Sequence, residues 1–406
     1  MGDDVLTSLA GTCTLREAQP GDAVDGVPAT VVASPADAGE TSALMRACDA
    51  AGLTVVVRGN ASKLSWGRPP ERVDVVLDTT GMDALVEHSR GDLIATAGAG
   101  MPLAVLRDRL AEGGHQLVVD DLVGISTLGG AVATGLAGPR RMWTGALRDL
   151  VIGVRFVRAD GTVAKAGGKV VKNVAGYDLS KLLTGSMGTL AVITEVTVRL
   201  HPVPASSWWV GATVPPDRLP QVLGTLVASQ LVPHAVEVHA VPGGDPQVAA
   251  LVSGTPAGSA ARAEAMAPLL GAGAQVAEEP PSWWGRIPTS DGAGSPLLLR
   301  TTARLSGIPE LVAEATGAGL TVTGSAGAGV LHAAGDGGLD ASAAVTALRT
   351  TSVRLGGSTV VLDAPAATKT TLDTWGEVPA LDLMRRVRNE FDPRRTLAPG
   401  RFVGDL

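Results

Sequence analysis

The stretch "STLGGAVATGLAGPRRMWTGALRDL", residues 126–150, gathers glycines beside hydroxyl and guanidinium groups. Because Gly129, Gly130 and Gly135 have no Cβ, their backbone can approach a bulky planar or phosphorylated ligand closely. A helix that begins after Thr127 would also direct its first amides at an anion. A small-residue helix packed closely on a sheet is the alternative. The polar side chains that could contact a ligand here are those of Thr127, Thr134 and Arg140.

A second glycine-bearing segment, "VVVRGNASK", lies upstream at residues 55–63. Its β-branched run predicts a strand that ends at Gly59 and leads into a tight loop. Successive amides in such a loop form an anion-binding concavity, and Ser62 and Lys63 add donors for phosphate oxygens. A plain strand-to-loop turn explains this segment equally well when it is taken alone.

A third segment, "KNVAGYDLSKLLTGSMGTL", lies downstream at residues 172–190 and holds Tyr177, the only tyrosine of the chain. Gly185 and Gly188 again allow close approach of the backbone. Taken alone, the segment fits a polar helix capped by glycine. Three such segments in one half of the chain favour a shared ligand.

Bulk properties limit the possible functions. A chain of 406 residues with 45% apolar residues is expected to form two domains. The net charge of -7, without a basic stripe, argues against nucleic acid or an anionic membrane as the main partner. Cys13 and Cys48 are too few for a four-cysteine zinc site or an iron–sulfur cluster and are expected to be buried thiols. No apolar run reaches the ~20 residues of a membrane span, which predicts a cytoplasmic protein without direct membrane insertion.

The order of predicted elements indicates an α+β architecture. Before residue 202 the sequence predicts a helix from about 36 to 52, several strands, and a hairpin around Asp160-Gly161. After residue 207 the sequence predicts a β-α-β-β-α order, and a similar alternation of strands and helices recurs from "LLLRTTA" to "TVVLDA". This order places helices on one side of an antiparallel sheet. The last helix is expected to bury Leu381, Met384, Val387 and Phe391 and to leave its arginines in solvent.

The ordered set of motifs at residues 58–63, 127–150, 172–178 and 185–190 closely resembles the FAD-binding domain of the vanillyl-alcohol-oxidase, or PCMH-type, flavoproteins. The "KNVAGYDLSKL" run is similar to that of the FAD-binding subunits of glycolate oxidases. This resemblance implies a PCMH-type FAD-binding domain of two α+β subdomains. A cap domain made of an antiparallel sheet and helices would follow, with a C-terminal return to the FAD domain. The expected bounds are 25–204 for the FAD-binding domain and 205–406 for the cap.

The resemblance also implies a set of cofactor contacts. The loop at 58–63 would hold the FAD pyrophosphate, and residues 127–135 would line the isoalloxazine and the pyrophosphate. Family members that link flavin covalently often carry His where this chain has Ser62, so the FAD is expected to be non-covalent. Asn60 and Ala61 replace the usual Gly-Gly pair, although alanine tolerates left-handed backbone poorly. The expected contacts are Arg58, Gly59, Asn60, Ala61, Ser62, Lys63, Thr127, Leu128, Gly129, Gly130, Thr134, Gly135, Arg140, Trp143, Gly145, Tyr177, Gly185, Gly188 and Ile193.

The resemblance implies one of two functions. The first is an FAD-dependent oxidoreductase that oxidises a small 2-hydroxy acid such as glycolate and passes electrons to a partner. The expected partners are a catalytic flavoprotein subunit and an iron–sulfur subunit. The second is a non-catalytic FAD-bearing subunit that relays electrons or completes a complex, with the substrate site on another chain.

The histidines of the expected cap, residues 205–406, do not form a metal site in the sequence pattern. His234 and His239 stand five apart on a strand pattern and face opposite sides, and His332 with Asp336 lacks the rest of a ligand set, so no metal is predicted. No residue could be named as catalytic base. Arg401 is expected to form a structural salt bridge in preference to holding a substrate carboxylate.

Overall fold

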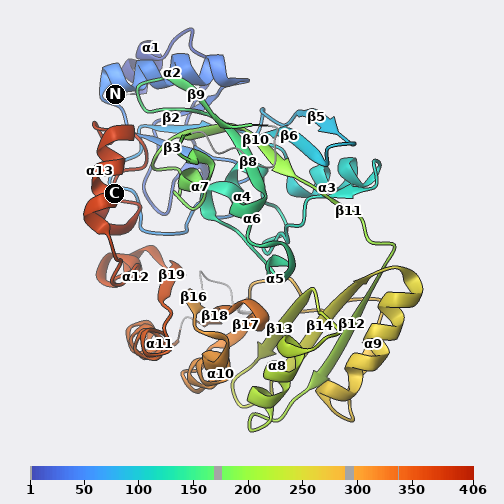
Figure 1. Cartoon of the computed structure of the whole chain (residues 1–406). Helices are drawn as coiled ribbons and strands as arrows, with labels where there is room; N and C mark the ends of the chain where they lie inside the picture. Colours follow the sequence, from blue (N-terminus) through green and yellow to red (C-terminus); the bar gives the residue numbers. More distant parts are fainter. Residues whose placement is uncertain (1, 169–175, 289–296, 337) are drawn as a thin grey trace.

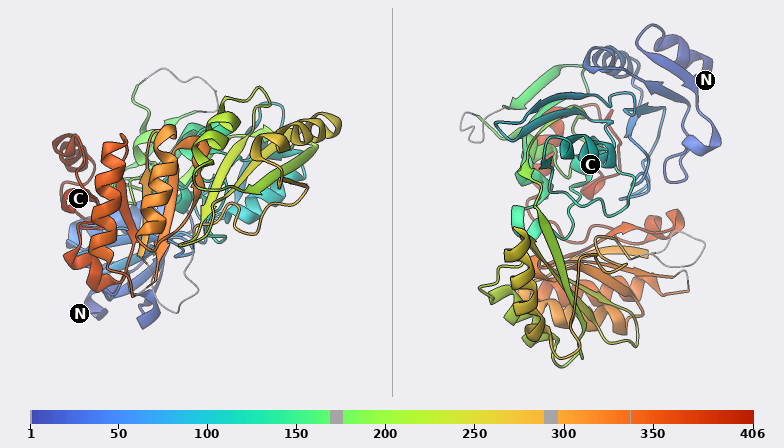
Figure 2. Two further views of the ribbon diagram at one scale, coloured as in Figure 1. Left: turned by 90° about the horizontal axis from the view of Figure 1, so that it is seen from below. Right: turned by 90° about the vertical axis from the view of Figure 1, so that its right-hand side faces the viewer.

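The structure is a computed structural model that describes residues 2–168, 176–288, 297–336 and 338–406. Two units lie one above the other in Figure 1: an upper one formed by the first half of the chain and a lower one formed by the second half. The C-terminal helix returns to the upper unit, and the C-terminus lies within it (Figure 2). The α+β architecture predicted from the sequence is confirmed.

The first subdomain of the upper unit is built on a four-stranded sheet. Helix α2 (Ala38–Ala51) packs on it. Asp37 caps its N-terminus, since its carboxylate accepts hydrogen bonds from the amides of Gly39 and Glu40. Gly52, with a φ of 65°, caps its C-terminus. Cys48 is buried on this helix, which raises the pKa of its thiol to about 12, whereas Cys13 is only half-buried. Helix α1 (Gly2–Ser8) precedes the sheet in the chain. The strands, in sheet order, are β1 (Thr14–Glu17), β2 (Val31–Ser34), β4 (Val75–Asp78) and β3 (Val55–Arg58).

The second subdomain is a five-stranded antiparallel sheet with short helices against it. The predicted hairpin at Asp160-Gly161 is confirmed, since Gly161 turns the chain with a φ of 78°. Its strands, in sheet order, are β5 (Leu85–Ser89), β6 (Ile94–Gly98), β10 (Val192–Arg199), β8 (Val151–Val157) and β9 (Val163–Gly167). Its helices are α3 (Leu103–Ala111), α4 (Leu128–Thr134), α5 (Arg141–Thr144), α6 (Leu147–Leu150) and α7 (Leu179–Leu183), and a small ribbon joins β7 (His115–Gln116) to β11 (His201–Pro202).

The lower unit is an eight-stranded antiparallel sheet, which we call the cap. The β-α-β-β-α order predicted after residue 207 is confirmed, and the structure repeats it in the second run, where it adds a strand at Thr321–Ser325 that the sequence analysis missed. In sheet order the strands are β15 (Gln275–Ala277), β12 (Ser206–Thr213), β14 (Gln247–Gly254), β13 (Ala235–Ala240), β17 (Thr321–Ser325), β18 (Val330–Gly335), β16 (Leu297–Thr302) and β19 (Thr359–Asp363). The helices are α8 (Leu219–Ala228), α9 (Pro256–Leu270), α10 (Ile308–Gly317) and α11 (Ala341–Arg354).

The two faces of the cap sheet have different neighbours. Leu297, Leu299 and Ala333 pack with the cap helices, which lie on the side away from the upper unit (Figure 1). Leu298 and Ala334 instead belong to the core of the second subdomain. Side chains alternate along a strand, so the even-numbered residues of β16 and β18 face the upper unit.

The C-terminal tail closes the upper unit after α12 (Ala366–Thr371) and α13 (Leu381–Phe391). It runs beside β3, because the amide of Val55 donates to the carbonyl of Thr396 at 2.7 Å and the amide of Ala398 donates to the carbonyl of Val55 at 2.9 Å. The expected return of the chain therefore extends the first sheet.

The sequence prediction for α13 is wrong in one respect. Its predicted apolar residues are only half-buried, and its fully buried side chain is Arg388 at 2% exposure. Arg388 pairs with Asp392 at 3.0 Å and donates to the carbonyl of Leu397 at 2.6 Å. A guanidinium with such partners can replace an apolar side chain in the interior.

Candidate functional site

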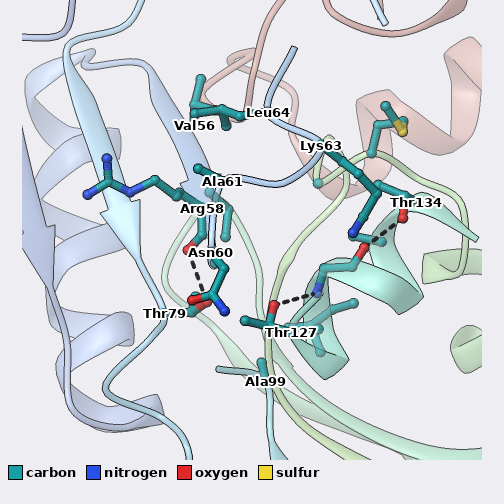
Figure 3. A pocket seen from close by; sticks show the side chains of 18 of the residues that line it. Val56, Arg58, Asn60, Ala61, Lys63, Leu64, Thr79, Ala99, Thr127 and Thr134 are labelled. Carbon is teal, nitrogen blue, oxygen red and sulfur yellow. Dashed lines mark hydrogen bonds between the residues drawn. The ribbon is translucent and has the colours of Figure 1, made fainter. Parts of the chain in front are cut away.

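An open cavity lies between the two subdomains of the upper unit. The loop that follows β3 forms one wall, and α4 and the start of β10 form the other (Figure 3). The predicted residues that line the cavity are Arg58, Gly59, Asn60, Ala61, Ser62, Lys63, Thr127, Gly129, Gly130, Thr134, Gly188 and Ile193.

The glycines of this cavity serve different purposes. A Cβ on Gly59 would lie 2.3 Å from Thr127 Oγ1, and a Cβ on Gly129 would lie 2.7 Å from the Cβ of Ala99. These two glycines are therefore required by packing within the protein. A Cβ on Gly130 would meet, among the described residues, only Thr127 Oγ1 at 3.0 Å, so the space beyond it is open to the cavity.

Thr127 fixes the start of α4, as the sequence predicted. Its hydroxyl accepts a bond from the amide of Gly130 at 3.2 Å, and its carbonyl accepts from the amide of Ala131 at 2.9 Å. Thr134 donates its hydroxyl to the carbonyl of Gly130 at 2.7 Å. Both threonines thus stabilise the short helix as well as lining the cavity (Figure 3).

Two residues that line the cavity have left-handed backbone without being glycine. Ala61 has a φ of 57° and Met187 has a φ of 55°. Such a conformation costs a non-glycine residue roughly 1–2 kcal/mol, and residues of this kind cluster at ligand sites. The position at which family members usually have glycine is therefore left-handed here as well.

Lys63 is a buried cation on the wall of the cavity, with 7% of its surface exposed. Its Nζ donates to Ser62 Oγ at 2.9 Å and to Ser126 Oγ at 2.6 Å, and Ser126 in turn donates to Asp121 at 2.6 Å. Burial lowers the pKa of Lys63 to about 8, partly offset by the charge of Asp121. An ammonium has three donors, so one is left for a ligand.

Arg58 differs from Lys63, although both belong to the same loop. Its guanidinium forms ion pairs with Asp22 and Asp78, each at 2.8 Å. Figure 3 shows that its side chain leaves the loop away from Lys63 and Thr134. Arg58 therefore offers the cavity its backbone, while its charge is neutralised elsewhere.

The structure does not bring the remaining predicted residues to this cavity. Leu128 is fully buried in the core, and Gly135 and Gly185 pack against each other at the end of α4. Tyr177 is 93% exposed. The other three lie on α5 or beside it. Arg140 donates hydrogen bonds to Asp120 and Gln116, and Trp143 stacks on His234 of the cap. Gly145 ends α5.

The cavity has lining residues that the motifs did not indicate. The most important is Arg401, which is 4% exposed and comes from the C-terminal tail. The expected salt bridge is wrong, because Arg401 forms no ion pair with any residue that the structure describes; its Nη2 donates to the carbonyls of Lys63, at 3.4 Å, and Leu64. The only signal in the sequence was the position of Arg401 after "LAPG". The other unpredicted residues are Val56, Val57, Leu64, Thr79, Ala99, Ala133, Met187 and Ala191.

A second polar cluster lies where the cap faces the upper unit. Arg141, Glu237 and His332 line a small cavity of about 10 Å³, and Arg300 is the cross-strand neighbour of His332. Burial lowers the pKa of His332 to about 3, with the charges of Arg300 and Arg141 acting in the same direction. Burial also raises the pKa of Glu237 well above its usual value. At neutral pH the cluster therefore holds two guanidinium charges beside a neutral imidazole and a carboxyl group whose ionisation burial disfavours.

The histidines considered for metal binding have separate partners. His234 stacks on Trp143 with ring centroids 4.3 Å apart, and His239 stacks on Trp283 and contacts Thr323 at 2.9 Å. Within the four described ranges, no three His, Cys, Asp or Glu residues lie together as a metal site would require. The described helices also include none that is long and apolar enough to cross a membrane.

Residues 29–167 match a protein-family model described as "FAD binding domain". This chain carries an FAD-binding domain. The resemblance to PCMH-type flavoproteins is thereby confirmed, and the predicted cofactor, FAD, is confirmed with it. The buried Lys63 and Arg401 fit the phosphates of this cofactor, and the space beyond Gly130 admits a ligand.

Two curated relatives each match less than half of the chain. It is 40% identical over 155 residues to the glycolate oxidase subunit GlcE of Escherichia coli (strain K12), which is 38% of this chain and 44% of the relative. It is 37% identical over 172 residues to a D-lactate dehydrogenase of Archaeoglobus fulgidus, which is 42% of this chain and 39% of the relative. The matches thus span less than half of the length of these relatives.

A solved structure extends the likeness of the fold to nearly the whole chain. An alkyldihydroxyacetonephosphate synthase superposes with a TM-score of 0.70, covering 98% of this chain and 84% of the synthase at 15% sequence identity. The likeness includes the cap. At this identity it concerns the fold alone.

Proposed function

We propose that this chain is an FAD-dependent oxidoreductase that oxidises the CH–OH group of a small 2-hydroxy acid, as the FAD-binding subunit of a glycolate oxidase or dehydrogenase complex. The observation that carries the proposal is the cluster that Arg141 of α5 forms with Arg300 and His332 of the cap, where the cap sheet faces the FAD-binding domain. Two relatives support it by name, since glycolate and D-lactate are both 2-hydroxy acids.

The two arginines would bind the carboxylate of the substrate. Neither Arg141 nor Arg300 forms an ion pair with a described residue, and burial lowers the pKa of each guanidinium. A carboxylate between them would supply the missing charge through planar, two-point hydrogen bonds.

His332 would accept a hydrogen bond from the substrate hydroxyl. With a pKa of about 3, its imidazole is neutral at physiological pH and is a weak base. Burial is the main cause of this low pKa, and a substrate carboxylate on Arg141 and Arg300 would cancel the two charges that lower it further. Binding would thus make His332 more basic, whereas bound FAD would supply the hydride acceptor.

The test is reduction of the reconstituted flavin by glycolate or D-lactate without oxygen, first with this chain alone. We expect the flavin absorbance to bleach, and we expect Arg300→Met to raise KM more than it lowers kcat. Arg354→Met is the matched control, because Arg354 pairs with Glu310 on the exposed side of the cap. Equal kinetics of the Arg300→Met and wild-type proteins would exclude the substrate site.

A second function remains open: a non-catalytic FAD-bearing subunit that relays electrons or completes a complex. It is favoured by the name of one relative, which is a subunit. A flavin that stays oxidised with the chain alone, but is reduced when a catalytic flavoprotein subunit and an iron–sulfur subunit are added, would support this function. We propose a cytoplasmic location and non-covalent FAD for both.

A further inference from the structure

Arg401 is a buried cation whose hydrogen bonds and charge are not fully matched by the described residues. Only 4% of its surface is exposed, and its Nη1 is buried without a hydrogen-bond partner in the described structure. Burial lowers its pKa to about 10, so the guanidinium still carries its charge at neutral pH. Asp25 and Asp363 attract it, but neither comes within ion-pair distance.

Those two carboxylates have another partner. Lys369 of α12 is completely buried and contacts Asp25 at 2.6 Å and Asp363 at 3.1 Å. A carboxylate already paired with one ammonium contributes less to a second, more distant cation. The charge of Arg401 thus remains largely uncompensated, which is rare for a buried group and calls for a ligand.

Arg401 and Lys63 are held next to each other. The Nη2 of Arg401 donates to the backbone carbonyl of Lys63 itself at 3.4 Å, and both residues line the same cavity. Neither cation forms an ion pair with a described residue, and the Lys63 ammonium has a spare donor. Both belong to the domain that binds FAD, whose pyrophosphate carries the anionic oxygens that two such cations recognise.

We propose that Arg401 and Lys63 together bind a phosphate group of FAD, so that the C-terminal tail, residues 392–406, is part of the cofactor site. The tail is anchored for this task by the hydrogen bonds of residues 396 and 398 to Val55, at the start of the strand that leads into the loop. FAD binding would therefore link the loop after β3 to the C-terminal tail. The inference concerns binding of the cofactor and does not depend on the proposed substrate.

The experiment is a titration of the apoprotein with FAD, followed by flavin fluorescence, at several salt concentrations. We expect Arg401→Gln to weaken FAD binding about 10- to 100-fold, since a hydrogen bond to a charged group contributes about 1.5–3 kcal/mol. The slope of log Kd against log salt should also become shallower, because one cation is lost. Arg401→Lys should retain more of the affinity and of the slope than Arg401→Gln.

Two controls separate a phosphate contact from support of the loop. Arg394→Gln changes an exposed arginine of the same tail that pairs with Asp49, and it should leave both the affinity and the slope unchanged. The dissociation constant of ADP, obtained by competition with FAD, should rise in Arg401→Gln together with that of FAD, while the dissociation constant of adenosine should be the same in both proteins.

The outcomes are decisive in both directions. An unchanged salt slope in Arg401→Gln, with ADP and adenosine weakened equally, would mean that Arg401 only supports the loop, and the proposal would be overturned. Loss of affinity for FAD and ADP but not for adenosine, with a shallower slope and an unaltered melting temperature of the apoprotein, would establish it. Neither result requires turnover, so failure of the proposed 2-hydroxy acid oxidation would not affect the interpretation.

Discussion

Gly129 and Gly130 are neighbours on α4, yet the structure predicts opposite effects when each is replaced. A Cβ at position 129 would lie 2.7 Å from the Ala99 side chain and 2.9 Å from its carbonyl oxygen, which cannot move without disturbing the end of β6. Overpacking of this kind costs typically 1–3 kcal/mol, and the gain in helix propensity returns at most about 1 kcal/mol. Gly129→Ala should therefore lower the stability of the apoprotein by up to about 2 kcal/mol.

At position 130 the balance is different. The new Cβ meets only Thr127 Oγ1 at 3.0 Å, a cap contact worth about 1 kcal/mol, and the propensity gain of about 1 kcal/mol offsets its disturbance. Gly130→Leu should thus leave the stability of the apoprotein within about 1 kcal/mol of the wild type. Its longer side chain would occupy the cavity, so FAD should no longer be retained.

The assay combines denaturant unfolding of the apoprotein with a flavin titration of each variant. Gly129→Ala is expected to shift the unfolding midpoint, whereas Gly130→Leu is expected to lose FAD binding with a nearly unchanged midpoint. A Gly130→Leu protein with normal flavin content would refute the reasoning, because the open space beside Gly130 would then not belong to the cofactor site.

Three further predictions concern other parts of the chain. Acid precipitation should release all of the flavin, since Ser62 stands where covalently linked relatives often have His; flavin that stays on the denatured chain would contradict non-covalent binding. Asp392→Ala should cost about 3–5 kcal/mol of unfolding free energy, because it leaves buried Arg388 without its carboxylate, while Asp382→Ala on the exposed face of α13 should cost less than about 1 kcal/mol in the same denaturation experiment. The pKa of Lys63 is lowered to about 8 in the folded apoprotein, below its unfolded value, so its burial penalty is present at low pH and is relieved as pH rises above about 8. FAD binding needs the charged form and should weaken above that pH; a titration in which Lys63→Arg shows the same decline as the wild type would assign it to another group.

Local chemistry allowed much of the upper unit to be predicted from the sequence. The cap of α4 at Thr127, the hairpin at Asp160-Gly161 and the loop at 58–63 depend on residues within a few positions of one another. Backbone conformation at such places is set by the presence or absence of a Cβ and by short-range hydrogen bonds. The glycine motifs therefore indicated the cavity and the cofactor, although not which glycine serves packing and which faces the ligand.

Charge placement, in contrast, was decided by tertiary structure. Arg140 and Arg141 are adjacent in the sequence, but Asp120 binds the first and leaves the second to face Glu237 and His332 of the cap. The same holds for Arg401, whose contacts with the carbonyls of the loop after β3 span more than 330 residues of chain. An arginine has the same intrinsic chemistry at every position; whether its charge is paired, solvated or available to a ligand depends on partners brought together only by the packing of distant elements.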